Sequence, residues 1–495
     1  MNEKILFWID AALTNYCMAF YLQRKIESDF FAIVDVFEKP KKFFQNQKLI
    51  NFKKKWFYHD YFKKFDSPDL EYLSKFEEKY KINLWQLAIN ERVFYRFNEI
   101  HKFSDEEILS ILEQECKLFE KILDEVSPDF YIAHEPVFHH QELLYQMCLK
   151  KGIRILLLNQ PNIGRCIISE KPRILDQKIN FSEINEDKKD FQELQEYRKS
   201  MTNFNQLINY KNKFKASTTE LIKAAFQFTL FNNIESHYTH KGKTKTKVFF
   251  QELKSILKRK YRQSFINKNL LTKIPENEKF IYYPLAVDAE RNLLIGAPFY
   301  TNQLEIIRFI SKSIPIDYKL YVKETPALSI RFWRSISEYK ELLDIPNVRL
   351  FHPSISAEKL IENCSLVITI TGSTGFDAAF FQKPSIIFSE LNYSVLPSVS
   401  QINSLEELPR TINDSLKKTV DPNDLNVYLK YIEKNSFEFD WLGFETKYND
   451  FFYFGGHLLS VEISESKMIS FLKENQNILE ILAKEHIKKI QEFKN

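Results

Sequence analysis

Short apolar runs alternate with stretches of helical periodicity in the first part of the chain. Lys4–Ile9 and Phe30–Val36 are rich in β-branched and aromatic residues and predict two strands, with a helix over about Thr14–Glu27 between them. The same order returns at Phe130–Ala133 and Ile153–Leu158, again with a helix between the two strands. Repeated strand–helix–strand units of this kind predict a doubly wound sheet, in which polar residues after the strands gather at one edge.

Two other stretches lie between these units. Residues 69–126 have helical periodicity, and Ser104 with Glu107 forms a capping-box signature for the second helix there. Residues 39–64 are basic and aromatic. That segment is either a solvated surface with anchored aromatic side chains, which we favour, or a loop that faces an acceptor or a membrane.

A second α/β set begins at Lys279. It is expected to contain strands at about 280–285, 319–322, 348–351, 366–370 and 385–388, and helices at about 301–314, 331–343, 357–363 and 376–381. We therefore expect a Rossmann-like domain over residues 1–181, a helical basic insertion over 182–278, a second Rossmann-like domain over 279–465 and a C-terminal helix over 466–495. The predicted fold class is α/β with two doubly wound Rossmann-like domains, and by analogy it is the GT-B architecture.

The helical insertion is strongly basic from Lys241 through Arg262, where Glu252 is the single acidic residue. One interpretation is a solvated helical face. The other is a surface that contacts an anionic membrane or a partner.

The turn after the strand at 366–370 carries candidate chemistry. Thr371-Gly372-Ser373-Thr374-Gly375 contains two of the nine glycines in the chain and precedes a predicted helix. Small residues let the backbone approach a ligand, and amides at a helix start, with the hydroxyls of Ser373 and Thr374, suit an anion such as a nucleotide phosphate. An ordinary βα turn with a capping hydroxyl is the competing interpretation. The spacing fits neither a P-loop nor GxGxxG.

Composition and charge restrict the binding partners and the cellular compartment that we expect. The chain has 495 residues, a net charge of +4 and five cysteines without ligand spacing. This small charge excludes an obvious nucleic-acid binder, and the cysteine pattern suits a reducing compartment. Asp10 and Asn15 interrupt the apolar N-terminus, so we expect no signal peptide and no membrane span, and a cytoplasmic location, peripheral to the inner face of the membrane.

The sequence resembles the surface-carbohydrate and capsule polysaccharide biosynthesis family. The front half contributes KINLWQLAINERVF and the region from PDFYIAHEP to GIRILLLNQPNIGR. The sharper motifs lie in the back half and are FIYYPLAVDAERNLL, FYTNQLEIIRFISKSIPIDYKLYVKETP, IPNVRLFHP and LVITITGSTGFDAAFFQKPSIIF.

The resemblance implies a GT-B glycosyltransferase that moves a sugar from a CMP- or UDP-sugar to a surface-glycan or lipid-linked acceptor. By motif position it implies nucleotide or phosphate contacts in two groups, Lys323, Glu324, Thr325 and Pro326 in the first and Gly372, Ser373, Thr374 and Gly375 in the second. Thr325 stands where the family usually has histidine, and Ala289 stands where it tends to have proline.

Two acidic residues near these motifs have two interpretations each. Glu290 either binds a ribose hydroxyl or caps the helix near Thr301. Asp377 either stabilises the first turn of its helix or contacts a ribose.

An inverting transfer also needs a base, which the front half must supply. The candidates near predicted strand ends are Asp10, His134, Glu135, His139 and His140, with Glu135 and His139 ahead of the others. We expect no metal, because His139 and His140 are adjacent and should point apart on a helix, and no cofactor beyond the nucleotide sugar. Two alternatives remain, a nucleotide-sugar epimerase of the same fold and a degenerate, non-catalytic scaffold of a glycan-assembly complex.

Overall fold

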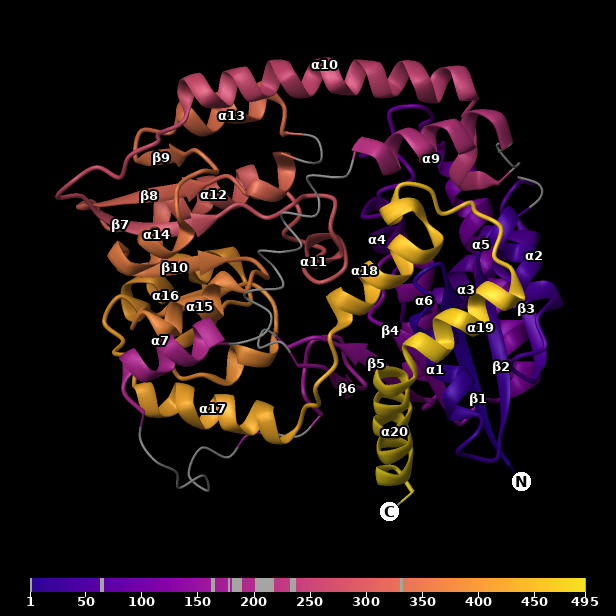
Figure 1. Ribbon diagram of the computed structural model, residues 1–495. Coiled ribbons are helices and arrows are strands. Elements are labelled where there is room, and N and C mark those ends of the chain that lie inside the picture. The colour runs from indigo at the N-terminus through magenta and orange to yellow at the C-terminus, as the bar shows by residue number, and fades with distance from the viewer. Residues whose placement is uncertain are drawn as a thin grey trace. The chain divides into compact units, whose positions relative to one another are not determined.

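The computed structural model describes residues 2–62, 66–161, 165–176, 179, 189–200, 218–231, 237–329 and 333–494. The chain forms two compact units (Figure 1). Unit 1 comprises Met1–Asp176, Thr202–Lys245 and Ser436–Asn495, and unit 2 comprises Gln177–Met201 and Thr246–Asn435.

Unit 1 is built on a six-stranded sheet in the order β3-β2-β1-β4-β5-β6. All neighbouring strands are parallel except β5 and β6. The strands are β1 (Glu3–Asp10), β2 (Ser28–Asp35), β3 (Phe52–Phe57), β4 (Phe130–His134), β5 (Arg154–Asn159) and β6 (Ile167–Ser169).

Side chains of β1 alternate between two hydrophobic cores, one on each face of this sheet. Ile5 and Phe7 belong to the core that also contains helix α1, and Leu6 and Trp8 belong to the core that contains α5. The helices of unit 1 are α1 (Thr14–Leu22), α2 (Lys39–Asn46), α3 (Leu70–Tyr80), α4 (Leu84–Ile89), α5 (Asp105–Val126), α6 (His139–Lys150), α9 (Thr218–Phe231), α18 (Trp441–Phe452), α19 (Glu465–Glu474) and α20 (Gln476–Glu492). The capping box of Ser104 and Glu107 at the start of α5 is confirmed.

Residues 39–64 contain an unpredicted helix and an unpredicted strand, α2 and β3. Phe43, Phe44 and Trp56 are buried, while Lys53 and Lys54 remain exposed. The aromatic side chains therefore anchor this basic segment to the core, which is the interpretation favoured from the sequence.

The C-terminal segment packs in unit 1, because Leu479, Leu482 and Ala483 of α20 belong to the same core as α1. The sequence predicts one C-terminal helix over 466–495, but the helix is interrupted at Asn475 and the segment forms two helices, α19 and α20. Unit 2 ends at Asn435, whereas the sequence predicts a domain over 279–465.

Unit 2 contains a second six-stranded sheet in the order β12-β11-β10-β7-β8-β9, with every neighbouring pair parallel. The strands are β7 (Lys279–Pro284), β8 (Tyr318–Lys323), β9 (Val348–Phe351), β10 (Leu366–Thr369), β11 (Ser385–Ile387) and β12 (Val399–Gln401). The helices are α7 (Phe191–Ser200), α10 (Lys245–Asn269), α11 (Arg291–Leu294), α12 (Gln303–Ser313), α13 (Ile336–Leu343), α14 (Ala357–Asn363), α15 (Thr374–Phe380), α16 (Leu408–Ser415) and α17 (Pro422–Lys434).

The two strand orders confirm the predicted fold class of two doubly wound, Rossmann-like domains. In each sheet the order reverses between two central strands, β1 and β4 in unit 1 and β7 and β10 in unit 2. The connections that follow these two central strands run to opposite faces of the sheet. A crevice therefore opens between them, beyond the carboxyl ends of the strands. Any ligand site of the doubly wound type is therefore expected after these four strands.

Candidate functional site

The turn that follows β10 lies at the reversal point of unit 2. The Gly372 amide donates to Thr369 Oγ1 at 3.1 Å, and the Gly372 carbonyl accepts the Tyr393 hydroxyl at 2.5 Å. A Cβ atom at position 375 would lie 2.8 Å from Tyr393 Oη, so glycine is required there by the close approach of the tyrosine ring. Contacts within the protein thus fix the path of the turn and explain Gly375 without a ligand.

Contacts within the protein do not explain the two hydroxyl residues of this turn. Ser373 is exposed and Thr374 is half-buried at the start of α15. Neither side chain is hydrogen-bonded to another residue within the described part of the chain, and Ser373 does not cap the helix with its hydroxyl. Both hydroxyls therefore remain available to an acceptor or donor on a ligand.

Glu324 lies just after β8, which is separated from β10 by β7 in the sheet, and it is a buried structural anchor. Its carboxylate accepts the Thr325 amide at 2.8 Å, the Tyr339 hydroxyl at 2.7 Å and Nε of Arg334 at 3.1 Å. Its side chain is fully buried and its oxygens are occupied by these donors, so it holds the β8 end in place. Lys323 is also buried, and its ammonium group donates to the Glu324 carbonyl at 3.3 Å.

Arg334 joins the β8 end to the loop after β7. Besides Glu324, it is paired with Asp288 and donates to the Ala286 carbonyl. Burial by itself lowers the pKa of the Arg334 guanidinium, but the adjacent Glu324 and Asp288 more than offset this and raise it. Sequence reasoning missed Asp288 and Arg334, although an acidic residue soon after a central strand was a usable signal for the first.

The structure places Glu290 and Asp377, the two acidic residues for which the sequence leaves two interpretations each. Glu290 precedes α11 without capping it through its side chain, and the helix after Thr301 is capped by Asn302 instead. Asp377 is ion-paired with Arg198 of α7 at 3.0 Å. Burial raises the pKa of the Asp377 carboxyl, and Arg198 opposes that shift.

In unit 1, Asp10 and His134 meet at the reversal point, because each ends one of the two central strands. His134 Nε2 lies 2.5 Å from Asp10 Oδ2, and His134 Nδ1 lies 2.9 Å from the Glu135 carbonyl. Burial lowers the pKa of His134, but Asp10 and the Glu135 carbonyl raise it to about 9 overall. At neutral pH His134 is therefore an imidazolium that faces Asp10.

Glu135 is paired instead with Arg173, whose Nε lies 3.1 Å from Glu135 Oε2. His139 lies farther inside, at the start of α6. Its Nδ1 is 2.8 Å from Glu91 and its Nε2 is 3.0 Å from Glu115. Burial lowers the pKa of His139, but these two carboxylates raise it to about 10, so at neutral pH each ring nitrogen holds a proton unless a cation takes its place.

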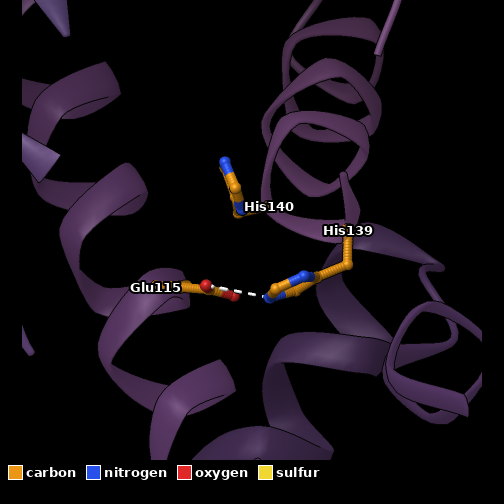
Figure 2. A group of neighbouring side chains, drawn as sticks. All are labelled: Glu115, His139 and His140. Carbon is orange, nitrogen blue, oxygen red and sulfur yellow. Dashed lines mark hydrogen bonds and ion pairs between the residues drawn. The ribbon is translucent and has the colours of Figure 1, made fainter. Parts of the chain in front are cut away.

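His140 lies beside His139 and close to Glu115 (Figure 2). One ligand atom from each of Glu115, His139 and His140 falls within 4.8 Å of the others. The expectation that the adjacent histidines point apart is thus not met, because the first turn of α6 directs a nitrogen of each ring toward Glu115 of α5.

The surface of α10 combines basic and apolar side chains. Phe249, Phe250, Leu257 and Tyr261 are 61%, 68%, 69% and 71% exposed. The helix carries eight lysines and arginines and one acid, Glu252. Within the part of the chain that the structure describes, every helix is too short or too polar to span a bilayer.

Comparisons with solved structures return remote similarities. UDP-GlcNAc 2-epimerase from Methanocaldococcus jannaschii is 11% identical, with 86% of this chain and 99% of that chain covered and a TM-score of 0.25. Thermosulfurimonas dismutans KpsC, a beta Kdo 2,7 transferase, is 13% identical, with 71% and 98% covered and a TM-score of 0.28. The N-terminal domain of Candida albicans trehalose-6-phosphate phosphatase is 14% identical, with 92% and 97% covered and a TM-score of 0.30. TM-scores this low carry no argument about this chain.

No curated protein matches the sequence. Residues 189–417 match the family model described as capsule polysaccharide biosynthesis protein. That range includes most of unit 2, with its complete sheet, the β8 end and the turn after β10. The match therefore agrees with the resemblance noted from the sequence, and residues 189–417 are similar to the capsule polysaccharide biosynthesis family.

Proposed function

We propose that the protein is a glycosyltransferase that moves a sugar from a CMP- or UDP-sugar to a surface-glycan or lipid-linked acceptor. The observation that carries this proposal is the pair of available hydroxyls, Ser373 and Thr374, at the reversal point of the second sheet. Hydroxyls and backbone amides at this position suit a sugar-nucleotide phosphate, and the family match supports a role in glycan assembly.

The leaving phosphate is negatively charged and needs donors or a cation. In this proposal the hydroxyls of Ser373 and Thr374 and the backbone amides of the turn other than that of Gly372 supply the donors, and Lys323 supplies positive charge from the end of β8. Glu324 acts through its three hydrogen bonds, which keep the Lys323–Pro326 segment in position. We expect transfer to proceed without added Mg²⁺ and with inversion at the sugar carbon.

Asp10 is the residue we assign as the base that takes the acceptor proton. Among the candidates, the nitrogens of His134 and His139 already face hydrogen-bond acceptors, and Glu135 is paired with Arg173. Asp10 lies at the reversal point and accepts from the Ala12 amide at 2.9 Å and from His134, so lone pairs remain on its carboxylate. His134 then acts as a positioning residue for Asp10.

As part of the proposal, α10 contacts an anionic membrane surface on which a lipid-linked acceptor is presented. Residues 249, 253 and 257 recur every four positions and therefore share one side of the helix. This exposed apolar stripe, with the excess of lysine and arginine around it, is the composition of a helix that lies in a membrane interface.

Calorimetric titration with CMP, UDP and GDP tests the site. We expect one of the three to bind the wild-type protein and Ser373→Ala and Thr374→Val to weaken that binding about tenfold, since each removes a hydrogen bond to a charged group. Ser264→Ala, at another exposed serine, is the matched control. Absence of nucleotide binding, or unchanged binding in both site variants, would refute the assignment.

Product analysis separates the transferase from its alternatives. Conversion of the nucleotide sugar without any acceptor would identify an epimerase, whereas a transferase forms its product only with a second substrate. A scaffold would show neither reaction, and Thr325→His would restore neither nucleotide affinity nor turnover.

A further inference from the structure

A buried cluster in unit 1 has the composition of a metal site. Glu115 comes from the middle of α5, and His139 and His140 come from the first turn of α6. All three residues are buried, with 0%, 3% and 6% of their surface exposed. Two imidazoles and one carboxylate are a common protein ligand set for zinc.

Two atoms of the cluster have no hydrogen-bond partner. Glu115 Oε2 and His140 Nδ1 are both buried, and within the described part of the chain nothing donates to or accepts from them. A buried carboxylate oxygen or imidazole nitrogen left in this state is costly, by about 1–3 kcal/mol each. The cost disappears if both atoms are ligands of one cation.

The remaining nitrogen of each imidazole is directed at a carboxylate outside the cluster. His139 Nδ1 lies 2.8 Å from Glu91 Oε2, and His140 Nε2 lies 3.2 Å from Asp35 Oδ2. A carboxylate in this position fixes the proton on the nitrogen that faces it and leaves the lone pair on the opposite nitrogen. In His139 that opposite nitrogen faces Glu115, and in His140 it is Nδ1, which is buried without a hydrogen-bond partner among the described residues. The outer partners therefore favour the tautomers that a metal requires.

Glu115 is oriented in the same way. The Tyr58 hydroxyl donates to Glu115 Oε1 at 2.5 Å, and the Tyr238 hydroxyl lies 3.0 Å from that of Tyr58. The second oxygen of the carboxylate is then the one left over for a ligand bond. Each of the three side chains is thus held by a group that is not itself a proposed ligand.

We propose that Glu115, His139 and His140 bind one divalent transition-metal ion, zinc in the first instance, through Glu115 Oε2, His139 Nε2 and His140 Nδ1. Zinc bonds of about 2.0–2.2 Å require the three atoms to draw closer than the present 4.8 Å limit. Calcium and magnesium are disfavoured because they prefer oxygen ligands alone.

The ion has a structural role and does not depend on the proposed glycosyl transfer. Its ligands are buried, so no sugar substrate reaches them, and it joins α5 to the start of α6. Since α6 follows directly after the Asp10–His134 pair and the Glu135 loop, the ion keeps that edge of the first sheet in position. Nucleotide binding to unit 2 tests a different site, so either proposal can fail without the other.

The test begins with the wild-type, full-length protein. Elemental analysis after desalting is expected to give about one zinc per chain, and the chelator-treated protein is expected to recover one Zn²⁺ per chain with a higher melting temperature. Co²⁺ loaded in place of zinc should give visible absorption bands of a low-coordinate nitrogen and oxygen site. A wild-type protein that retains no zinc, is not stabilised by Zn²⁺ and gives no such bands refutes the proposal.

Variants locate the ion. Glu115→Gln and His140→Leu should each abolish stoichiometric Zn²⁺ retention and the Co²⁺ bands. His486→Leu is the matched control, because His486 is also fully buried in unit 1 but bonds only to the Leu482 carbonyl among its described neighbours. Retention of one zinc by both cluster variants, or its loss in His486→Leu alone, would place the ion elsewhere and overturn the assignment. Because the wild-type measurements decide whether an ion binds, a variant that fails to fold does not leave the question open.

Discussion

Replacing the exposed apolar side chains of α10 should weaken binding to anionic membranes. The informative variant combines Phe249→Ser, Phe250→Ser and Leu257→Ser. Full burial of such a side chain is worth about 1.5–3 kcal/mol, and roughly two thirds of each is exposed. Three of them together offer about 3–6 kcal/mol, and insertion to half that depth gives about 2 kcal/mol, or about a 30-fold loss in partitioning.

The basic residues contribute separately and depend on salt. Lys254, Lys258 and Lys260 lie on the same helix, and each lysine near an anionic surface is worth about 1 kcal/mol. Their combined change to glutamine should weaken binding at low ionic strength and have little effect at high salt, because added ions screen these charges. The serine variant should lose affinity at both ionic strengths, since the apolar contribution is not screened.

Cosedimentation with vesicles provides the assay. Vesicles of phosphatidylcholine alone are compared with vesicles that also contain phosphatidylglycerol, and circular dichroism checks that each variant keeps its helices. Phe299→Ser and Ile316→Ser are matched controls in unit 2, because Phe299 is 82% exposed and Ile316 is fully exposed, and both lie outside α10. Equal binding of the wild type to both vesicle types, or unchanged binding of the serine variant, would refute the membrane role.

Three further predictions concern the two sheets. Gly375→Ala should lower the free energy of unfolding of unit 2 by about 1–3 kcal/mol in urea titrations, because its Cβ would meet the Tyr393 hydroxyl at 2.8 Å, and no loss would contradict this packing. Arg334→Leu leaves the buried carboxylates of Glu324 and Asp288 without their cation and should lower the free energy of unfolding by about 3–5 kcal/mol in the same titrations. No change would show that this ion-pair network does not stabilise the protein. The pKa of His134 is raised from 6.5 to about 9, so its contribution of ~3 kcal/mol is full below pH 6.5 and is lost as pH rises through 9. The stability difference between wild type and Asp10→Asn should therefore shrink over that range, and a constant difference would contradict it.

The sequence was sufficient to predict five of the six strands of the second sheet, all except β12. The strand at 348–351 and the helix at 357–363 have the predicted bounds, and the strand before the Thr371–Gly375 turn ends one residue early. A parallel sheet is covered on both faces, so its strands are continuous apolar runs that stand out between polar loops. Strand β3 was missed for the opposite reason. FKKKWF is an edge strand in which only Trp56 is buried, and its three lysines interrupt the apolar pattern that would predict a strand.

The candidate sites were only partly predictable. The hydroxyls after β10 and the strand-end residues Asp10 and His134 could be found, because position relative to a strand end is a local property. Glu115 could not, because it lies in the middle of a helix and becomes buried only when the distant His139 packs against it. Long-range pairing of this kind leaves no mark in the local pattern of either segment.

The two reversal points carry different chemistry, although the two sheets share one topology. At the first, His134 is hydrogen-bonded to Asp10, so a carboxylate lies at this edge of the sheet. At the second, the Glu324 carboxylate is hydrogen-bonded to donors within the protein, and the turn after β10 offers hydroxyl and amide donors. A proton acceptor and an anion binder are the two functions that a transferase must separate. For this reason Asp10→Asn should lower turnover with nucleotide affinity unchanged, while Ser373→Ala should lower nucleotide affinity.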